Sequence, residues 1–222
     1  MKTQADWIII AAQAEKQEIV LPDHSAITLS PGSSIRYDRL SFGKKERYIE
    51  LAGKAFFNVN HLKNVPFHIN TPLADIQVLG TQFQVVSTKD STVTWIVSGK
   101  VRFSTSRQCT DLTQNMRAIV NRENGQIQVS AKDHLNELAW KTHRLVYQNT
   151  PLREVVADLE KLYQIKLKNI PPQNLKLTAT FDTMEISDIL YIINQTLDTN
   201  LTITIQPVSY THLRAHETLR HL

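Results

Sequence analysis

The chain has 222 residues, of which 41% are hydrophobic and 21% charged, with a formal net charge of +4. This length suits one large domain or two small ones, and the near-average globular composition excludes a mainly disordered chain. Acidic residues are mixed with basic ones along most of the chain, whereas a nucleic-acid binder concentrates its positive charge on one face or tail. Nucleic-acid binding is therefore not expected.

The single cysteine, Cys109, cannot form an internal disulfide and does not indicate a compartment. The most apolar run, Trp7 to Ala12, is six residues long, whereas a membrane-spanning helix needs about 20. The N-terminus also lacks the long apolar stretch of a signal peptide. We therefore expect a soluble protein or the soluble part of a larger one.

Short strands separated by turns are predicted from Ile8 to about Val129. Segments such as Ala26 to Leu29 alternate apolar and polar residues, which is typical of half-buried strands, and turn-forming pairs such as Pro31-Gly32 separate them. Strands at this spacing predict an all-β sandwich, barrel or solenoid over residues 8–130, without a helix. The predicted strands are Ile19–Leu21, Ala26–Leu29, Ile35–Tyr37, Tyr48–Leu51, Ala55–Val59, Phe67–Asn70, Asp75–Leu79, Phe83–Val86, Val93–Val97, Val101–Phe103, Arg117–Val120 and Ile127–Val129.

Helical periodicity begins after a predicted linker or short helix over residues 131–142. Apolar residues from Leu152 to Leu162 fall on one helical face, with Thr150 as the predicted cap and Pro151 in the first turn. A second helix is predicted from Ile186 to Leu197. The strands predicted beside these helices are Arg144–Tyr147, Ile165–Leu167, Leu177–Phe181 and Leu201–Ile205.

An internal repeat relates these two helical segments. A shift of 34 positions places Tyr147 on Phe181 and Leu152 on Ile186. Neither half could bury its apolar face alone, so we predict a small α/β domain of two β-α-β units over residues 143–206. Residues 207–222 fit neither pattern and are expected to be non-native or disordered.

Several motifs lie in the predicted β region. Leu21-Pro22-Asp23-His24-Ser25 precedes a strand, Gly53-Lys54-Ala55-Phe56-Phe57 leads into one, and Val78-Leu79-Gly80-Thr81-Gln82-Phe83 joins two. They resemble motifs in the periplasmic region of FecR-family anti-sigma factors, with His24 and Lys54 where the family usually has Gly and Glu. We interpret Val78, Leu79, Gly80, Thr81 and Phe83 as structural, because Gly80 permits a positive φ or a close backbone approach.

The C-terminal part carries a second resemblance. Trp140, Pro151-Leu152-Arg153-Glu154-Val155 and Tyr163 resemble the C-terminal module of the same family, which is similar to the short signalling domain of secretins and TonB-dependent transducers. Together the resemblances cover roughly residues 15 to 206. We interpret Trp140 as a structural anchor, like Trp7 and Trp95.

The resemblance implies a periplasmic sensing region of an inner-membrane, single-pass anti-sigma factor. Such a region relays a signal from an outer-membrane TonB-dependent transducer to an extracytoplasmic-function sigma factor. The relatives' sigma-binding segment and membrane helix are missing from this sequence. The chain is therefore expected to act on the sigma factor, and to reach the membrane, only through those parts.

The transducer is expected to bind by strand addition at an open edge of the C-terminal sheet. The candidate binding residues are Leu177, Thr178, Ala179, Thr180, Phe181, Leu201, Thr202 and Ile203. The alternative is a secreted carbohydrate-binding or structural β module. Only 7% of the residues are aromatic, and they alternate with apolar residues as core positions do, which argues against a sugar-binding platform.

No catalytic, cofactor-binding or metal site is predicted, and an enzyme is not expected. Ser98-Gly99-Lys100 lacks the upstream Gly and the following Ser or Thr of a P-loop. Gly32-Ser33-Ser34 lacks the flanking pattern of a nucleophile elbow. Asp133, His134 and Glu137 lie within one helical turn, but a solvated linker explains them better than a metal site does.

Overall fold

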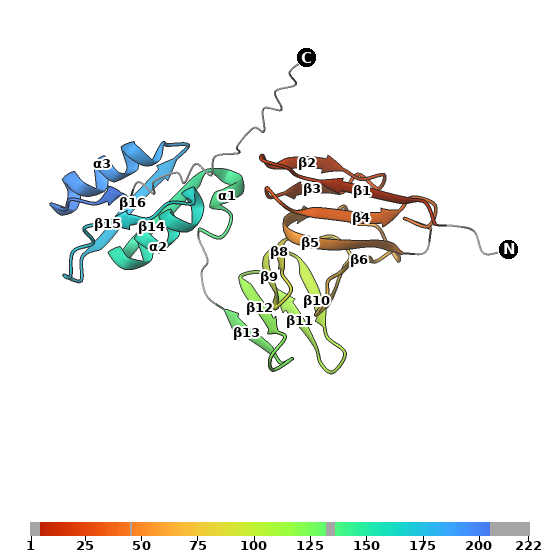
Figure 1. The fold of residues 1–222 in the computed structure, drawn as a ribbon. Coiled ribbons are helices and arrows are strands. Elements are labelled where there is room, and N and C mark those ends of the chain that lie inside the picture. The colour runs from red at the N-terminus through yellow and green to blue at the C-terminus, as the bar shows by residue number, and fades with distance from the viewer. Residues whose placement is uncertain (1–4, 45, 132–135, 205–222) are drawn as a thin grey trace, which may run out of the picture. The chain divides into compact units, whose positions relative to one another are not determined.

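A computed structural model describes residues 5–44, 46–131 and 136–204. The chain divides into two compact units, the first unit (Met1–Thr142) and the second unit (His143–Leu222). Figure 1 shows their helices and strands. The predicted tail at 207–222, together with Asp133 and His134, lies outside the described residues.

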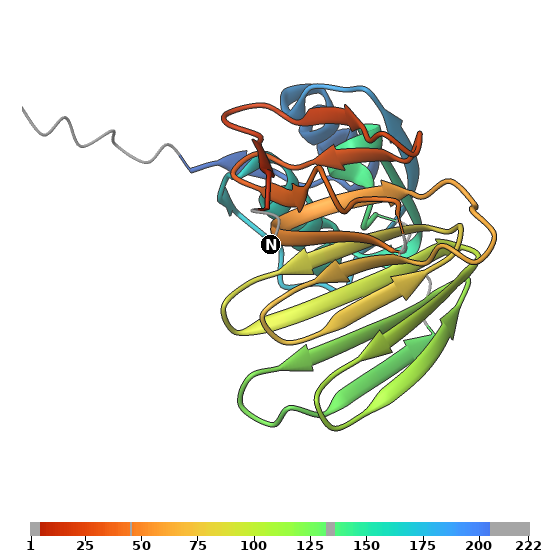
Figure 2. The same ribbon diagram turned by 90° about the vertical axis from the view of Figure 1, so that its right-hand side faces the viewer.

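The first unit consists almost entirely of strands in two sheets that share a core (Figure 2). Sheet A has the strand order β1-β4-β5-β6-β7-β10-β11, and sheet B has the order β2-β3-β5-β8-β9-β12-β13. Neighbouring strands are antiparallel except for β5 and β6, which are parallel. The strands are β1 (Trp7–Ala11), β2 (Gln17–Val20), β3 (Ala26–Leu29), β4 (Ser34–Asp38), β5 (Arg47–Asn58), β6 (Phe67–Asn70), β7 (Asp75–Val78), β8 (Gln82–Ser87), β9 (Ser91–Ser98), β10 (Lys100–Ser104), β11 (Cys109–Thr113), β12 (Met116–Asn121) and β13 (Ile127–Ala131). The prediction of a mainly β domain is confirmed.

Strand β5 joins the two sheets. Its first half pairs with β4 and β6 in sheet A, and its second half pairs with β3 and β8 in sheet B. The two strands predicted at 48–51 and 55–59 are therefore one. The change of sheet occurs at Gly53, whose φ is 91°, and a Cβ built there would lie 2.5 Å from the Ser33 hydroxyl oxygen.

The core of the first unit follows from the alternation along these strands. Phe57 from sheet B packs against Phe67 from sheet A, with ring centroids 6.5 Å apart, and stacks on Phe83 at 5.2 Å. All three side chains are fully buried. Burying aromatic rings from both sheets stabilises their face-to-face packing.

Two strands were missed by the sequence patterns. β1 contains a run of three isoleucines without polar alternation, and Trp7 and Ile9 are exposed on it. β11 is mostly polar, with Leu112 as its one buried residue. Trp7, interpreted as a core or seam anchor, does not lie in the core, because its side chain is 46% exposed and lies beneath the Arg36 guanidinium.

A four-residue helix, α1 (Ala139–Thr142), lies within the segment predicted as a linker or short helix. It contacts sheet B through Trp140, whose indole N–H donates to the Gln84 side-chain oxygen at 2.6 Å. The Lys54 ammonium lies 4.7 Å from the centroid of the Trp140 ring, which adds a cation–π contact. This part of the linker is therefore fixed to the first unit.

The second unit contains two helices that alternate with strands, as predicted. Its elements are β14 (Arg144–Pro151), α2 (Leu152–Tyr163), β15 (Leu167–Lys168), β16 (Lys176–Asp182), α3 (Ile186–Leu197) and β17 (Thr202–Ile203). The predicted cap is wrong, because β14 continues to Pro151, which is itself the cap residue and makes no side-chain cap bond. The Thr150 hydroxyl instead accepts a hydrogen bond from the Gln148 backbone N–H at 3.1 Å.

The 34-residue repeat is visible in the hydrogen bonds of the second unit. Each helix ends in a left-handed residue. In the first repeat, the Glu160 carboxylate accepts from the Leu167 backbone N–H at 2.8 Å. In the second, the Asn194 side-chain oxygen accepts from the Leu201 N–H, also at 2.8 Å. The same position of each repeat thus ties the next strand to its helix.

Candidate functional site

Strand β16 presents an open backbone edge. It pairs with β14 in an antiparallel two-stranded sheet, from Arg144 opposite Asp182 to Pro151 opposite Lys176. Among the described residues, no strand pairs with the other side of β16. Unpaired backbone N–H and C=O groups at such an edge are a template for an added strand.

The five candidate residues on β16 alternate between two faces of the strand, with Leu177, the half-buried Ala179 and Phe181 on one face and Thr178 and Thr180 on the other. Leu177 and Phe181 are buried, with exposures of 1% and 3%, so their side chains belong to the core. Thr178 and Thr180 are exposed, and the Thr178 hydroxyl oxygen accepts from the Asn149 N–H at 2.9 Å. A partner at this edge would therefore meet the backbone and the two threonines.

The other three candidate residues lie elsewhere in the unit. Leu201 is buried, while Thr202 and Ile203 form β17, which pairs with β15 in a second two-stranded sheet. The structure therefore does not bring all eight candidates onto one edge. β16 offers the longer edge, seven residues against two.

A hollow of about 600 Å³ lies beside the end of α2. It is lined by Ala157, Glu160, Lys161, Gln164, Ile165, Lys166 and Thr204. The Glu160 carboxylate is engaged by the Leu167 N–H and by the Lys166 ammonium at 2.9 Å. These bonds lower the pKa of Glu160, the backbone bond most. Its carboxylate is thus a structural acceptor.

The Val78–Thr81 motif in the first unit joins β7 to β8 and is held by its neighbours. A Cβ on Gly80 would lie 2.6 Å from the Cβ of His61, so the glycine is needed for close approach and not for a positive φ. The buried Thr81 hydroxyl donates to the Lys100 carbonyl at 2.8 Å. Leu79 is 48% exposed, so it is the one apolar side chain of the motif that reaches solvent.

Beneath this motif lies a buried ion pair that the sequence patterns did not reveal. Arg47 and Asp23 are joined at 2.8 Å, with side-chain exposures of 0% and 4%. The guanidinium also donates to the carbonyls of Asn60, Val65 and Leu79. The turn at residues 21–25, which contains Asp23, and the Val78–Thr81 motif are therefore both held by the Arg47 guanidinium.

A signal for Arg47 was present in the sequence. Arg47, Ile49 and Leu51 occupy alternate positions of one strand, and all three point to the core. A charged residue on the apolar side of a strand needs a buried partner. The sequence could not show that Asp23, 24 positions earlier, is that partner.

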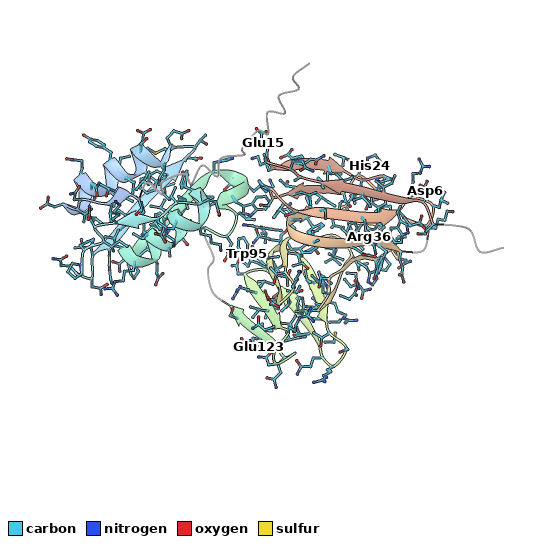
Figure 3. All side chains as sticks on the ribbon, viewed as in Figure 1. Asp6, Glu15, His24, Arg36, Trp95 and Glu123 are labelled. Atoms are coloured by element: carbon cyan, nitrogen blue, oxygen red, sulfur yellow. The ribbon has the colours of Figure 1, made fainter. Side chains whose placement is uncertain are left out.

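Asn115 and His24 both have a left-handed backbone. Asn115, between β11 and β12, has φ 64°, a conformation that asparagine tolerates better than most residues. His24, which replaces a usual glycine, has φ 65°. Figure 3 shows His24 at the edge of the first unit.

The described residues contain neither a candidate metal site nor a candidate membrane-spanning helix. No group of three or more His, Cys, Asp or Glu side chains there could hold a metal ion. No helix in the described ranges has the length and apolar character needed to cross a bilayer.

Comparison with known proteins gave matches in both units. The family described as "FecR protein" matches residues 8–102, and the family described as "FecR, C-terminal" matches residues 144–208. Two crystal structures of a "putative anti-sigma factor" from Parabacteroides distasonis ATCC 8503 are similar. One is 26% identical and covers 89% of this chain and 98% of its own, with a TM-score of 0.63. The other is 27% identical and covers 89% and 99%, with the same TM-score. No curated protein matches significantly.

Proposed function

The chain belongs to the FecR family, with a FecR domain followed by a FecR C-terminal domain, and on this premise we propose that it is the periplasmic sensing region of an anti-sigma factor. Its partner is the periplasmic signalling domain of an outer-membrane TonB-dependent transducer. Binding of that domain changes the state of the regulator and releases an extracytoplasmic-function sigma factor.

We propose that the transducer domain binds by adding a strand to β16. The observation that carries this proposal is the open edge of β16 among the described residues. Main-chain hydrogen bonds would supply affinity, and Thr178 and Thr180 would supply side-chain contacts. β17 (Thr202–Ile203) is a weaker candidate because its edge is only two residues long.

The function proposed is regulatory. Members of the FecR family are typically not enzymes, and the candidate surface is a backbone edge with two hydroxyl side chains. Such a surface suits protein–protein recognition. It offers no pairing of a nucleophile with a base.

A proline scan of the edge tests this proposal. Successive backbone N–H groups of a strand point to opposite sides, so Ala179→Pro and Thr180→Pro remove donors on different edges. One variant breaks the ladder to β14 and lowers the melting temperature. The other removes a donor from the open edge and keeps its stability. We expect this stable variant to lose transducer binding by about tenfold or more, measured by biolayer interferometry.

Thr180→Val is the matched control, because it keeps the backbone donor and the side-chain shape; it removes only the hydroxyl contact and should lower affinity by no more than about fivefold. Wild-type affinity in the stable proline variant would contradict strand addition at β16. Absence of any binding between the folded wild-type chain and its cognate transducer domain would contradict the proposed function itself.

A further inference from the structure

The outer face of sheet A carries a row of polar and aromatic side chains. Tyr48, His68, Gln77, Arg102 and Asp111 lie opposite one another on five consecutive strands. Neighbouring strands are about 4.8 Å apart, so Tyr48 and Gln77 are separated by about 10 Å. All five side chains point away from the core, which takes the alternate residues of these strands.

A hollow of about 430 Å³ lies at one end of this row. The side chains that line it include His61, Gln77, Leu79, Lys100, Arg102 and Asp111. Its volume falls within the range of small-molecule sites, about 300–1,000 Å³. The row and the hollow share Gln77, Arg102 and Asp111 and therefore form one continuous surface.

The floor of the hollow is held in place from below. Arg47 donates to the Leu79 carbonyl at 3.1 Å and to the Val65 carbonyl at 2.7 Å. Gly80 lets the backbone of His61 approach closely. Because Arg47 is fully buried and each bond has a fixed partner, the positions of Leu79 and His61 are set before any ligand arrives.

The surface offers the contacts that a sugar ring needs. Leu79 is 48% exposed and Tyr48 is 40% exposed, so both can pack against the C–H faces of a sugar. Tyr48 stacks on His68 at 6.2 Å, which fixes the orientation of its ring. The Gln77 amide makes no side-chain hydrogen bond to another described residue, so its donor and acceptor are available for hydroxyl groups.

The charges that line the hollow favour a negative group of the ligand at that end of the surface, away from the carboxylates of Asp75, Glu50 and Glu46 near Tyr48. Arg102 and Asp111 form a two-pronged pair at 2.9 and 3.2 Å and largely neutralise each other. The hydrogen bond from Arg102, more than the nearby charge of Lys100, lowers the pKa of Asp111, so the carboxylate stays ionised. Lys100 forms no ion pair with any described residue and leaves the hollow with a net positive charge.

We propose that this face of the first unit binds a saccharide that carries a carboxylate. Lys100 receives the carboxylate, Gln77 and His61 bind hydroxyl groups, and Leu79 and Tyr48 pack against the rings. The structure thus revises the sequence-based argument against a sugar platform, because Tyr48 lies on the outer face of its strand. All these residues belong to the first unit, so the site is independent of the proposed transducer contact.

Isothermal titration calorimetry of the full chain with an oligogalacturonate tests the proposal, with a neutral malto-oligosaccharide of equal length as comparator. We expect the acidic saccharide to bind and the neutral one to bind about tenfold more weakly or not at all. Lys100→Gln should reduce affinity for the acidic saccharide about tenfold. Tyr48→Ala should also reduce it, because an aromatic contact is lost.

Matched controls are available on the same chain. Lys89→Gln removes an exposed lysine from the β8–β9 turn, and Tyr191→Ala removes a tyrosine that is 67% exposed on α3. Both should bind like wild type. The proposal is overturned if the acidic saccharide does not bind at millimolar concentration. It is also overturned if the neutral one binds equally well, or if Lys100→Gln has no more effect than Lys89→Gln.

Discussion

The Arg47 guanidinium makes five hydrogen bonds in a fully buried setting, to Asp23 and to three backbone carbonyls. Arg36 forms a two-pronged pair with Glu50, but its side chain is 50% exposed. Figure 3 shows Arg36 on the outside of sheet A. Substituting each arginine in turn therefore compares a buried ion pair with an exposed one in the same sheet.

We expect Arg47→Met to lower the free energy of unfolding of the first unit by about 3–5 kcal/mol, because it leaves the Asp23 carboxylate buried and unpaired. Arg36→Met should cost much less, because its pair with Glu50 is exposed to solvent. Urea unfolding followed by tryptophan fluorescence measures both, since all three tryptophans lie in the first unit. Equal effects of the two substitutions would show that burial of the Arg47 pair is not what stabilises this region.

Tyr147 provides a second test at the level of a single residue. It is 1% exposed, and its hydroxyl has no hydrogen-bond partner in the described structure. Burial raises its pKa above the usual range of tyrosine. The equivalent residue of the other repeat, Phe181, lacks the hydroxyl, and the two rings pack at 6.2 Å.

We therefore expect Tyr147→Phe to stabilise the second unit by about 1 kcal/mol, because an unpaired buried hydroxyl is removed. Tyr163→Phe is the control. It removes a hydroxyl that donates to the Met184 carbonyl at 2.8 Å and should destabilise by about 1 kcal/mol. Thermal unfolding by circular dichroism checks both variants, and destabilisation by Tyr147→Phe would refute the argument.

Among the elements, β5 shows how one strand serves two sheets. Its crossing point, Gly53, combines a positive φ with close contact to Ser33. Gly43 also has a positive φ, 80°, but a Cβ there would meet nothing within 4 Å. Comparing substitutions at Gly43 and Gly53 therefore separates the cost of a positive φ from the cost of a steric clash.

We expect Gly43→Ala to cost about 1 kcal/mol, from the left-handed backbone alone. Gly53→Ala should cost clearly more, by about 2 kcal/mol, because Ser33 and its hydrogen bond to the Lys54 N–H must also shift. Urea unfolding of both variants provides the comparison. Similar losses would mean that the close contact at Gly53 has no energetic weight.

How far the elements could be predicted depends on their periodicity. The two helices were predicted almost to their ends because a 3.6-residue period over three turns is hard to imitate. The crossing of β5 from sheet A to sheet B was not predicted, because Gly53 and Lys54 in the middle of the strand resemble a turn. The β11 strand was missed because its sequence is polar and only Leu112 faces the core.

The candidate sites were predictable to a lesser degree. The sequence located β16, but it could not show that Leu177 and Phe181 face the core while the edge beside them stays open. The hollow beside Leu79 depends on strands far apart in the chain, joined by the register of β7, β10 and β11. Periodicity gives the face of each residue, but not which strands are neighbours.

At the scale of the whole molecule, α1 is the last element of the first unit, which ends at Thr142. The bond from Trp140 to Gln84, at 2.6 Å, joins it to sheet B. Trp140→Phe keeps the apolar ring and removes this bond. We expect amide exchange at Lys141 and Thr142 to become about fivefold faster, since a bond of about 1 kcal/mol is lost.

Trp7→Phe is the control, because Trp7 is half-exposed on β1 and its replacement should leave exchange in α1 unchanged. Unchanged exchange in Trp140→Phe would show that α1 is held by other contacts.

The two units have separate proposed roles, with the transducer edge in the second unit and the saccharide face in the first. The most direct test of the regulatory role is hydrogen–deuterium exchange of the chain with and without its cognate transducer signalling domain. We predict slower exchange in β16, residues 176–182, with little change in the strands of the first unit. Unchanged exchange in β16 under conditions where the two proteins bind would contradict it.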